Sequence, residues 1–168
     1  MNLHSRHGTV TELAIRERPH LPPRSSLDLS EHLPYLINRV GSALVERFCA
    51  DALATAGLSI AAWRVLAVLA THGGLRQTDL AALTSIEVST LSRLITRLVH
   101  DGLVRRTRSR ADTREVAVAL TGRARTMLGK LIPIAAGLQS TATRGLAKRD
   151  LATLRRVLRQ MHRNLTAP

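Results

Sequence analysis

The stretch from residue 75 to residue 121 constrains the fold most, because it sets short elements in one order. Residues 79–84 and 88–100 each repeat apolar side chains at helical spacing, and three residues form the turn between them. Residues 103–107 and 115–120 then read as two strands that flank an arginine-rich loop. Two short helices followed by a hairpin with a basic tip predict a winged helix-turn-helix, which holds DNA in two grooves.

The second short helix, residues 88–100, carries the predicted reading surface. Its apolar residues are spaced to face inward, namely Val88, Leu91, Leu94, Ile95 and Leu98. Short hydroxyl side chains let a helix backbone approach base edges, and arginine reaches guanine or phosphate. An isolated helix of this kind is more often an ordinary solvated face, but the basic hairpin directly after it favours DNA. We expect DNA contacts from the outer face, namely Ser89, Thr90, Ser92, Arg93 and Arg97.

The preceding short helix is expected to place Leu80 and Leu83 inward, with Thr78 capping its first turn and contacting DNA. The hairpin loop holds five arginines at positions 105, 106, 108, 110 and 114, with one acid among them. A narrow minor groove draws in arginine, and an acid two residues away can fix the direction of an inserted guanidinium. The alternative is a solvated turn with an incidental ion pair. We expect DNA contacts from Arg108, Arg110, Asp112 and Arg114.

The charge balance points to the same partner. The chain has 25 basic and 12 acidic residues, for a formal net charge of +13. Only Lys130 and Lys148 are lysines, so 23 of the bases are arginine, the residue suited to phosphate and guanine edges. A genome rich in G and C also favours arginine codons, although it does not explain the sign of the charge. The basic balance alone would also fit an anionic membrane surface.

Four segments are expected along the chain, and the fold class is mainly α with a small β-hairpin wing. Residues 1–27 form a flexible arm, 28–57 a dimerisation helix capped by Asp28, 58–121 the DNA-binding lobe, and 122–168 the C-terminal dimerisation helices. Ser59 and Thr121 are expected to cap helices. The apolar stripes of the first and last helices can pack within one subunit or across a two-fold axis. The second arrangement is favoured, because DNA half-sites call for two readers.

The remaining composition argues against several classes of site. Cys49 is the only cysteine, so no intramolecular disulfide and no cysteine-based metal cluster can form. The histidines do not cluster at metal-binding spacing, and neither a metal nor a cofactor is expected. No apolar run is long enough to span a bilayer, and the N-terminus lacks the apolar segment of a signal peptide. These features predict a cytoplasmic protein associated with the nucleoid.

Residues 33–165 resemble the MarR family of dimeric winged-helix transcription regulators. The motifs that carry the resemblance are Asp79-Leu80-Ala81, Ser89-Thr90-Leu91-Ser92-Arg93-Leu94, Gly102-Leu103-Val104, Asp112-Thr113-Arg114 and Val116-Ala117-Val118-Ala119-Leu120-Thr121. The resemblance implies an obligate homodimer, residues 88–100 in the major groove, and Arg114 directed by Asp112 into the minor groove. It also implies repression of neighbouring genes, relieved by a small anionic aromatic compound.

Two differences from characterised branches of the family constrain the effector. Peroxide-sensing members carry a cysteine near the start of the first long helix, whereas Cys49 lies about three turns further on and is expected to be a buried structural thiol. Urate-responsive members carry an acid after the tryptophan of the second helix, whereas Arg64 follows Trp63 here. Arg39 and Arg64 can each clamp a carboxylate, with Asn38 and Trp63 completing the site. The alternative is surface arginines and a core tryptophan.

The sequence therefore predicts a repressor that binds a palindromic operator and is released by an aromatic carboxylate or a phenol. The alternative is a non-specific architectural protein of the nucleoid, which the charge alone would fit. An enzyme is not expected, because the acidic residues are dispersed and no arrangement of Ser, His and Asp or of Cys and His stands at a credible position.

Overall fold

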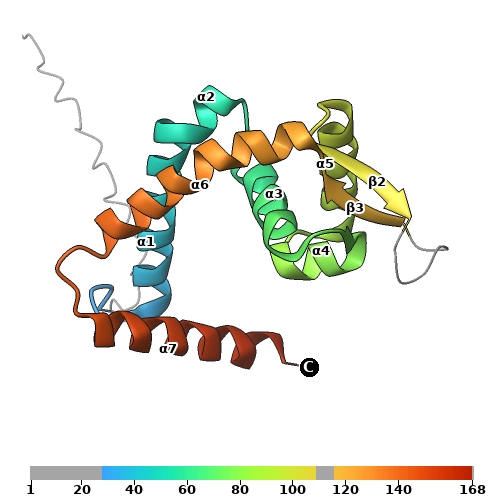
Figure 1. Ribbon diagram of the computed structural model, residues 1–168. Coiled ribbons are helices and arrows are strands. Elements are labelled where there is room, and N and C mark those ends of the chain that lie inside the picture. Colours follow the sequence, from blue (N-terminus) through green and yellow to red (C-terminus); the bar gives the residue numbers. More distant parts are fainter. Residues whose placement is uncertain (1–27, 109–115, 168) are drawn as a thin grey trace, which may run out of the picture. The chain divides into compact units, whose positions relative to one another are not determined.

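The computed structural model describes residues 28–108 and 116–167, and the chain divides into two units, Met1–Leu36 and Ile37–Pro168. The sheet, which Figure 1 shows beside α5, belongs to the larger unit, as do both buried clusters. The elements in chain order are α1 (Leu33–Phe48), the π-helical turn η1 (Cys49–Leu53), α2 (Ala54–Ala56), α3 (Ile60–His72), β1 (Leu75–Arg76), α4 (Gln77–Thr84), α5 (Val88–His100), β2 (Val104–Arg108), β3 (Val116–Leu120), α6 (Gly122–Ala142) and α7 (Lys148–Thr166).

The first helix begins later than its sequence signal predicts. Asp28 Oδ1 accepts a hydrogen bond from the Ser30 backbone N–H at 2.8 Å, so this residue closes a local turn and does not cap α1. The predicted helix start at Asp28 is therefore wrong, and α1 begins at Leu33. The helical path then continues through η1 and α2 to Gly57, which ends it in the left-handed conformation at φ 65°.

Two predicted caps are confirmed and a third is wrong. The Ser59 hydroxyl accepts from the Ala62 N–H at 3.1 Å, and the Thr121 hydroxyl accepts from the Ala124 N–H at 3.2 Å. Thr78 does not cap α4, because the helix already begins at Gln77 with Arg76 in the capping position. The start of α4 is held by an ion pair instead, with Arg76 Nε 3.0 Å from Asp79 Oδ2.

The predicted hairpin is confirmed and forms the larger part of a three-stranded antiparallel sheet. The strand order is β1-β3-β2, with Val104 opposite Leu120 and Arg108 opposite Val116. The two-residue strand β1 pairs Leu75 with Val118 on the other edge of β3. The strand between α3 and α4 is thus tied to the same hairpin that follows α5, which makes the DNA-binding lobe one connected unit.

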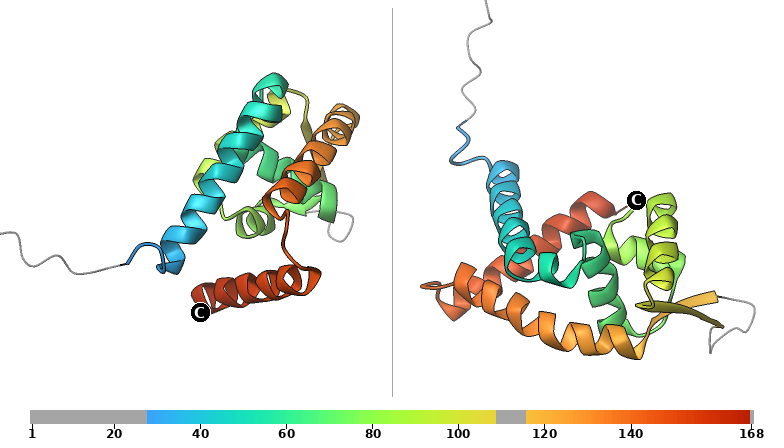
Figure 2. Two further views of the ribbon diagram at one scale, coloured as in Figure 1. Left: turned by 90° about the vertical axis from the view of Figure 1, so that its left-hand side faces the viewer. Right: turned by 90° about the horizontal axis from the view of Figure 1, so that it is seen from above.

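One cluster of fully buried side chains joins α3, α4 and α5 to the sheet and to the start of α6. Its centre includes Leu66, Leu80, Leu91 and Ile95, each with no exposed surface. Figure 2 shows α6 leaving the hairpin and running past α3. This helix therefore continues the chain directly from the hairpin and packs against both α3 and η1.

A second, smaller cluster lies where η1 meets α6. It contains Phe48, Leu53 and Leu131, with the Trp63 ring 4.9 Å from the Phe48 ring in an edge-to-face arrangement. Cys49 packs against this cluster and is partly buried, which is close to the expected structural thiol. Two side chains expected to face the core are half exposed instead, Leu83 at 50% and Val88 at 48%.

Several apolar side chains of α1, α6 and α7 face outward. They follow the helical stripes seen in the sequence, and no residue of α7 is buried. The exposed members include Leu36, Ile37, Val40, Ile132, Ile134, Leu154, Val157, Leu158 and Leu165. Among the described residues no single helix is long and apolar enough to cross a membrane, although the bent pair Leu33–Ala56 and Ile60–His72 meets the criterion of length and composition together.

The different burial of two leucines in α4 gives a matched test of this packing. Leu80 is fully buried, and Leu80→Ala should lower the free energy of unfolding by about 2–5 kcal/mol because it leaves a cavity. Leu83→Ala removes the same atoms from a half-exposed site and should cost less than about 1 kcal/mol. Urea denaturation at one fixed protein concentration measures both. Equal losses from the two variants would contradict the described orientation of α4.

Candidate nucleic-acid interface

The outer face of α5 presents the polar side chains that the sequence predicts for it. Leu91, Ile95 and Leu98 are buried, and this fixes the rotation of the helix. Ser89, Thr90, Arg93 and Arg97 are exposed as a consequence, and Ser92 is half buried. Thr78 is also exposed, in the first turn of α4. The structure thus brings hydroxyl groups to the start of α5 and two guanidinium groups to its middle.

Glu87 occupies the N-cap of α5, a role that the sequence reading missed. Its carboxylate accepts from the backbone N–H groups of Ser89 and Thr90, both at 2.9 Å, and from the Ser89 hydroxyl. These bonds, with the Ser89 hydroxyl as the largest cause, lower the pKa of Glu87 to about 2. The carboxylate therefore stays ionised at the positive end of the helix. Glutamate is uncommon as a cap, which is why the sequence reading left this residue in the turn.

The Glu87 contact also fixes what Ser89 offers to a partner. Because the Ser89 hydroxyl donates its proton to Glu87, its free lone pairs act as acceptors. In the major groove the matching donors are the amino groups of cytosine and adenine. The first free N–H groups of α5 are already bonded to the Glu87 carboxylate and are not open to a phosphate group. The start of α5 is therefore suited to contact with base edges.

The hairpin contributes basic side chains next to α5. Arg105 and Arg106 are exposed on β2, and Arg106 Nη2 donates to Thr96 Oγ1 on α5 at 3.4 Å. Arg108 ends β2 opposite Val116. The other predicted contacts of the loop, Arg110, Asp112 and Arg114, lie outside the described residues.

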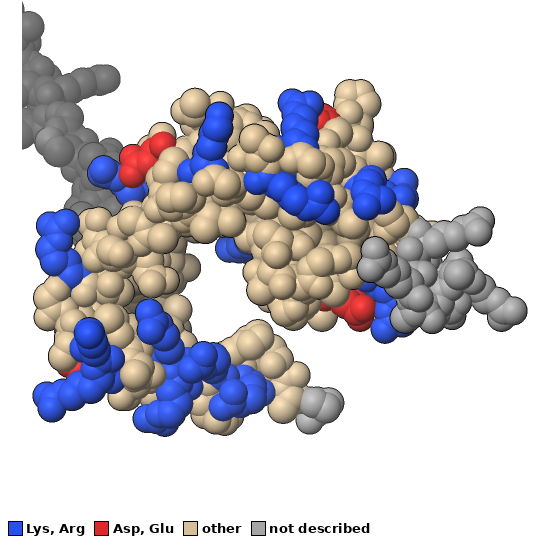
Figure 3. All heavy atoms as spheres, viewed as in Figure 1, with Lys and Arg blue, Asp and Glu red and all other residues tan. Residues whose placement is uncertain are grey.

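Basic charge by itself does not mark the reading surface. Figure 3 shows lysine and arginine side chains gathered over α7 as well as on the lobe. The basic residues of α7 are Lys148, Arg149, Arg155, Arg156, Arg159 and Arg163. What distinguishes α5 is that two exposed hydroxyls, Ser89 and Thr90, stand together in its first turn ahead of Arg93 and Arg97, whereas Thr153 is the single hydroxyl among the arginines of α7.

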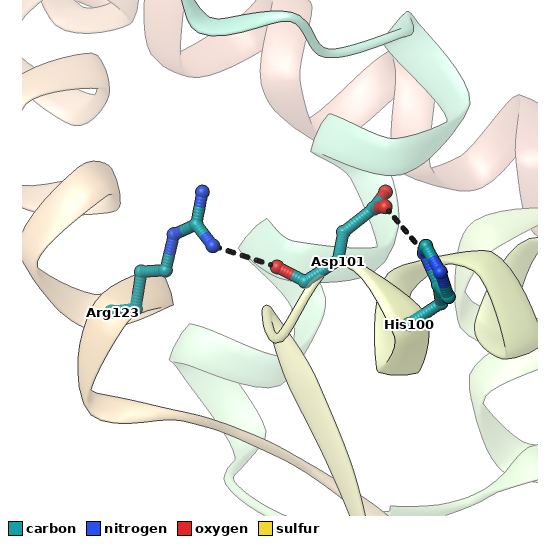
Figure 4. A network of polar contacts seen from close by, with 3 residues as sticks. All are labelled: His100, Asp101 and Arg123. Atoms are coloured by element: carbon teal, nitrogen blue, oxygen red, sulfur yellow. Dashed lines mark hydrogen bonds and ion pairs between the residues drawn. The ribbon is translucent and has the colours of Figure 1, made fainter.

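The turn that links α5 to the hairpin is held by the start of α6 (Figure 4). Arg123 Nη1 donates to the backbone carbonyl of Asp101 at 3.1 Å, and the Thr121 hydroxyl donates to the carbonyl of Gly102 at 2.8 Å. Gly102 has a φ of 67°, so a side chain there would be strained. His100 Nδ1 lies 3.4 Å from Asp101 Oδ1 and adds a weaker contact. The position of α5 is thus coupled to α6.

Of the four residues predicted to bind an effector, two line the same hollow and two do not. Asn38 and Arg64 line one hollow of about 540 Å³ between α1 and α3, together with Gly41, Ser42, Val45 and Glu46. Arg39 is exposed on α1 but does not line this hollow. Trp63 packs against Phe48 and both buried clusters, as expected of a core tryptophan. Within residues 28–108 and 116–167, no three His, Cys, Asp or Glu side chains are placed to hold a metal ion.

Comparison with known proteins agrees with this geometry. The family model described as MarR family matches residues 56–115, which contain α3, β1, α4, α5 and β2. A MarR family transcriptional regulator from Silicibacter pomeroyi has a TM-score of 0.74 at 29% identity, over 83% of this chain and 94% of that one. Residues 56–115 thus match the MarR family, and the chain as a whole is similar to MarR family transcription regulators. Those relatives are regulators of transcription.

Two further proteins to which this chain is similar have informative structures. The transcriptional repressor CouR, from Rhodococcus jostii RHA1, bound to a 23-mer DNA duplex has a TM-score of 0.70 at 28% identity, over 80% of this chain and 95% of that one. BpsR from Bordetella bronchiseptica, whose DNA binding is regulated by 6-hydroxynicotinic acid, has a TM-score of 0.69 at 26% identity, over 79% and 94%. No protein of curated function matches the chain.

The cap of α5 predicts a pH dependence of stability in this protein. The pKa of Glu87 is lowered in the folded state, so its stabilising contribution is complete above the unfolded value of 4.5 and is lost as the pH falls toward about 2. Urea midpoints of the wild type and of Glu87→Gln should therefore differ most above pH 4.5 and converge near pH 2. Glu46→Gln controls for the loss of a negative charge alone. A difference between wild type and Glu87→Gln that persists unchanged to pH 2 would show that the carboxylate does not cap the helix.

Proposed function

We propose that this protein is a homodimeric repressor of the MarR family that binds a palindromic operator and is released by a small aromatic carboxylate or a phenol. The observation that carries the proposal is the outer face of α5, where Ser89 and Thr90 stand about one turn before Arg93 and about two turns before Arg97. Hydroxyls that permit close approach, followed by guanidinium groups, suit a helix inserted N-terminus first into the major groove. We place this protein in the cytoplasm, where it has access to the DNA.

The hairpin supplies the second groove in this proposal. Arg114, directed by Asp112, enters the minor groove, and Arg108 and Arg110 also contact the DNA. The DNA-bound structure of the relative CouR supports contact with a duplex by this fold. Thr78, at the start of α4, then faces the phosphate backbone, because the first helix of the pair crosses the backbone.

The dimer is supported by apolar surface that a single chain leaves exposed. Leu36, Ile37 and Val40 on α1 and Leu154, Val157 and Leu158 on α7 form stripes open to solvent. Two copies can cover these stripes across a two-fold axis, which makes residues 28–57 and 122–168 the dimerisation segments and residues 58–121 the reading lobe. Two lobes related in this way bind half-sites about one helical turn apart, or about 10 bp.

The effector site in the proposal is the hollow between α1 and α3. Arg64 supplies a guanidinium that can bind a carboxylate in two hydrogen bonds, and Asn38 supplies an amide that can bind a ring substituent. Glu46, on the same wall, can accept from a phenol. The relative BpsR, which responds to 6-hydroxynicotinic acid, supports a ligand that combines an aromatic ring, a carboxylate and a hydroxyl.

A single arginine on α5 tests the DNA-binding role. The operator is first identified by selecting genomic fragments that the protein retains, and a palindrome is expected among them. Arg93→Ala should then weaken operator binding by about 1–3 kcal/mol, as expected for an arginine that contacts a base edge. Arg159→Ala, the same change on exposed α7, should leave the affinity within about twofold. Retained fragments with no shared sequence, or equal losses from both variants, would favour the non-specific architectural protein.

Calorimetry tests the effector site separately from DNA binding. Benzoates, cinnamates and nicotinates are titrated into the dimer, and at least one should bind with measurable heat. Arg64→Gln should weaken that binding at least tenfold because the carboxylate loses its charged partner, whereas Arg144→Gln, outside the hollow, should not. Heat that is unchanged in Arg64→Gln would place the ligand elsewhere.

A further inference from the structure

A second hollow, of about 610 Å³, lies between the η1–α2 segment and α6. Its floor is apolar and includes Ala52, Met127, Leu131 and Ile134. None of the residues that line the hollow between α1 and α3 takes part in it, so the two hollows are separate. A volume of this size accommodates a small organic molecule.

The charges around this second hollow select the chemistry of its occupant. Arg123 and Lys130 both line it from α6 and are exposed. Asp51 lies opposite, but its carboxylate is paired with Arg47, with Nε 2.6 Å from Oδ2, so its charge is already balanced. An apolar floor with two cations above it is complementary to an organic anion that has an apolar body.

Arg123 connects the hollow to the recognition helix. The same guanidinium that lines the hollow donates to the carbonyl of Asp101, at the C-terminal end of α5. It also lines a neighbouring hollow beside His100 and Asp101. An anion in the larger hollow offers Arg123 a charged partner in place of a neutral carbonyl, and hydrogen bonds between charged groups are the stronger ones. The turn after α5 would then lose its contact with Arg123 and keep those with Thr121.

We propose that the η1–α6 hollow is a second binding site, specific for an amphipathic organic anion, and that Arg123 couples its occupancy to the position of α5. The binding half of this proposal is independent of the proposed function. The coupling half rests on it, because it requires that α5 reads DNA. Binding and coupling therefore need separate measurements.

The two lysines of the chain allow the binding half to be observed directly. Reductive methylation with ¹³C-formaldehyde keeps the positive charge and labels Lys130, Lys148 and the N-terminal amine. Titration with 2-naphthoate should shift the Lys130 signal to saturation with a Kd below about 1 mM and leave the Lys148 signal unmoved. Lys130→Arg assigns the signal, and neutral 2-naphthamide should bind at least tenfold more weakly.

Several outcomes would overturn the binding site. An unmoved Lys130 signal would mean that the hollow does not bind such anions, or that a second copy of the chain covers it. Equal shifts at Lys130 and Lys148 would mean non-specific association with basic surface. Equal binding of 2-naphthamide would mean that the cations do not select the ligand. Arg64→Gln should leave the Lys130 shift unchanged, and its loss in that variant would assign naphthoate to the other hollow.

Operator affinity measured with and without saturating naphthoate tests the coupling half. Wild-type affinity should fall at least about fivefold, at the lower end of allosteric effects. In Arg123→Gln the fall should be less than twofold, because that side chain no longer links the anion to the Asp101 carbonyl. Arg123→Lys, which keeps the charge, should show an intermediate fall. An equal fall in wild type and Arg123→Gln, or a Lys130 shift with no change in wild-type affinity, would refute the coupling and leave the binding site standing.

Discussion

Burial of one face of α5 is the constraint on which the rest of the DNA-binding surface depends. Leu91, Ile95 and Leu98 pack into the cluster that joins α3, α4 and the sheet, so the helix cannot rotate without exposing them. Successive residues of a helix are about 100° apart, which means that this burial also decides which side chains face outward. The polar face of α5 is therefore a consequence of core packing, and it is presented rigidly before any DNA is bound.

Each end of α5 is fixed by a different kind of contact. At its start the Glu87 carboxylate takes up two backbone N–H groups and the Ser89 hydroxyl. At its end Thr121 and Arg123 bind the carbonyls of Gly102 and Asp101. The first contact is local, and it determines which hydrogen-bonding groups the start of the helix presents to bases. The second joins the helix to α6, which also lines the η1–α6 hollow, so a ligand beside α6 has a short physical route to the reading surface.

Periodicity and local capping predicted most of the lobe correctly. Ser59 and Thr121 were identifiable because their hydroxyls cap within three residues along the chain. Asp28 and Thr78 carry the same local signal but do not cap a helix, since an acid or hydroxyl can equally close a turn or stand one residue inside a helix. Leu83 and Val88 lie at the ends of their apolar stripes, where the core no longer covers them.

The parts of the site that depend on tertiary contacts were not predictable in the same way. Arg123 acts on Asp101, which is 22 residues earlier in the chain, and no sequence spacing marks such a pair. Asn38 and Arg64 were expected to lie together and do so, but Trp63, next to Arg64, points into the core. Neighbours along a helix point about 100° apart, so one of two adjacent residues commonly reaches a site without the other.

The central claim is that the face of α5 reads sequence and does not merely bind phosphate. Fluorescence anisotropy with the DNA upstream of the protein's own gene and with a scrambled duplex tests it, at about 0.15 M salt because phosphate binding depends steeply on salt. A specific regulator should bind its own DNA on the order of a thousandfold more tightly than the scrambled duplex. The account would be contradicted if the two duplexes bound with equal affinity and an operator selected from the genome also bound no more tightly than the scrambled duplex, with the same steep salt dependence.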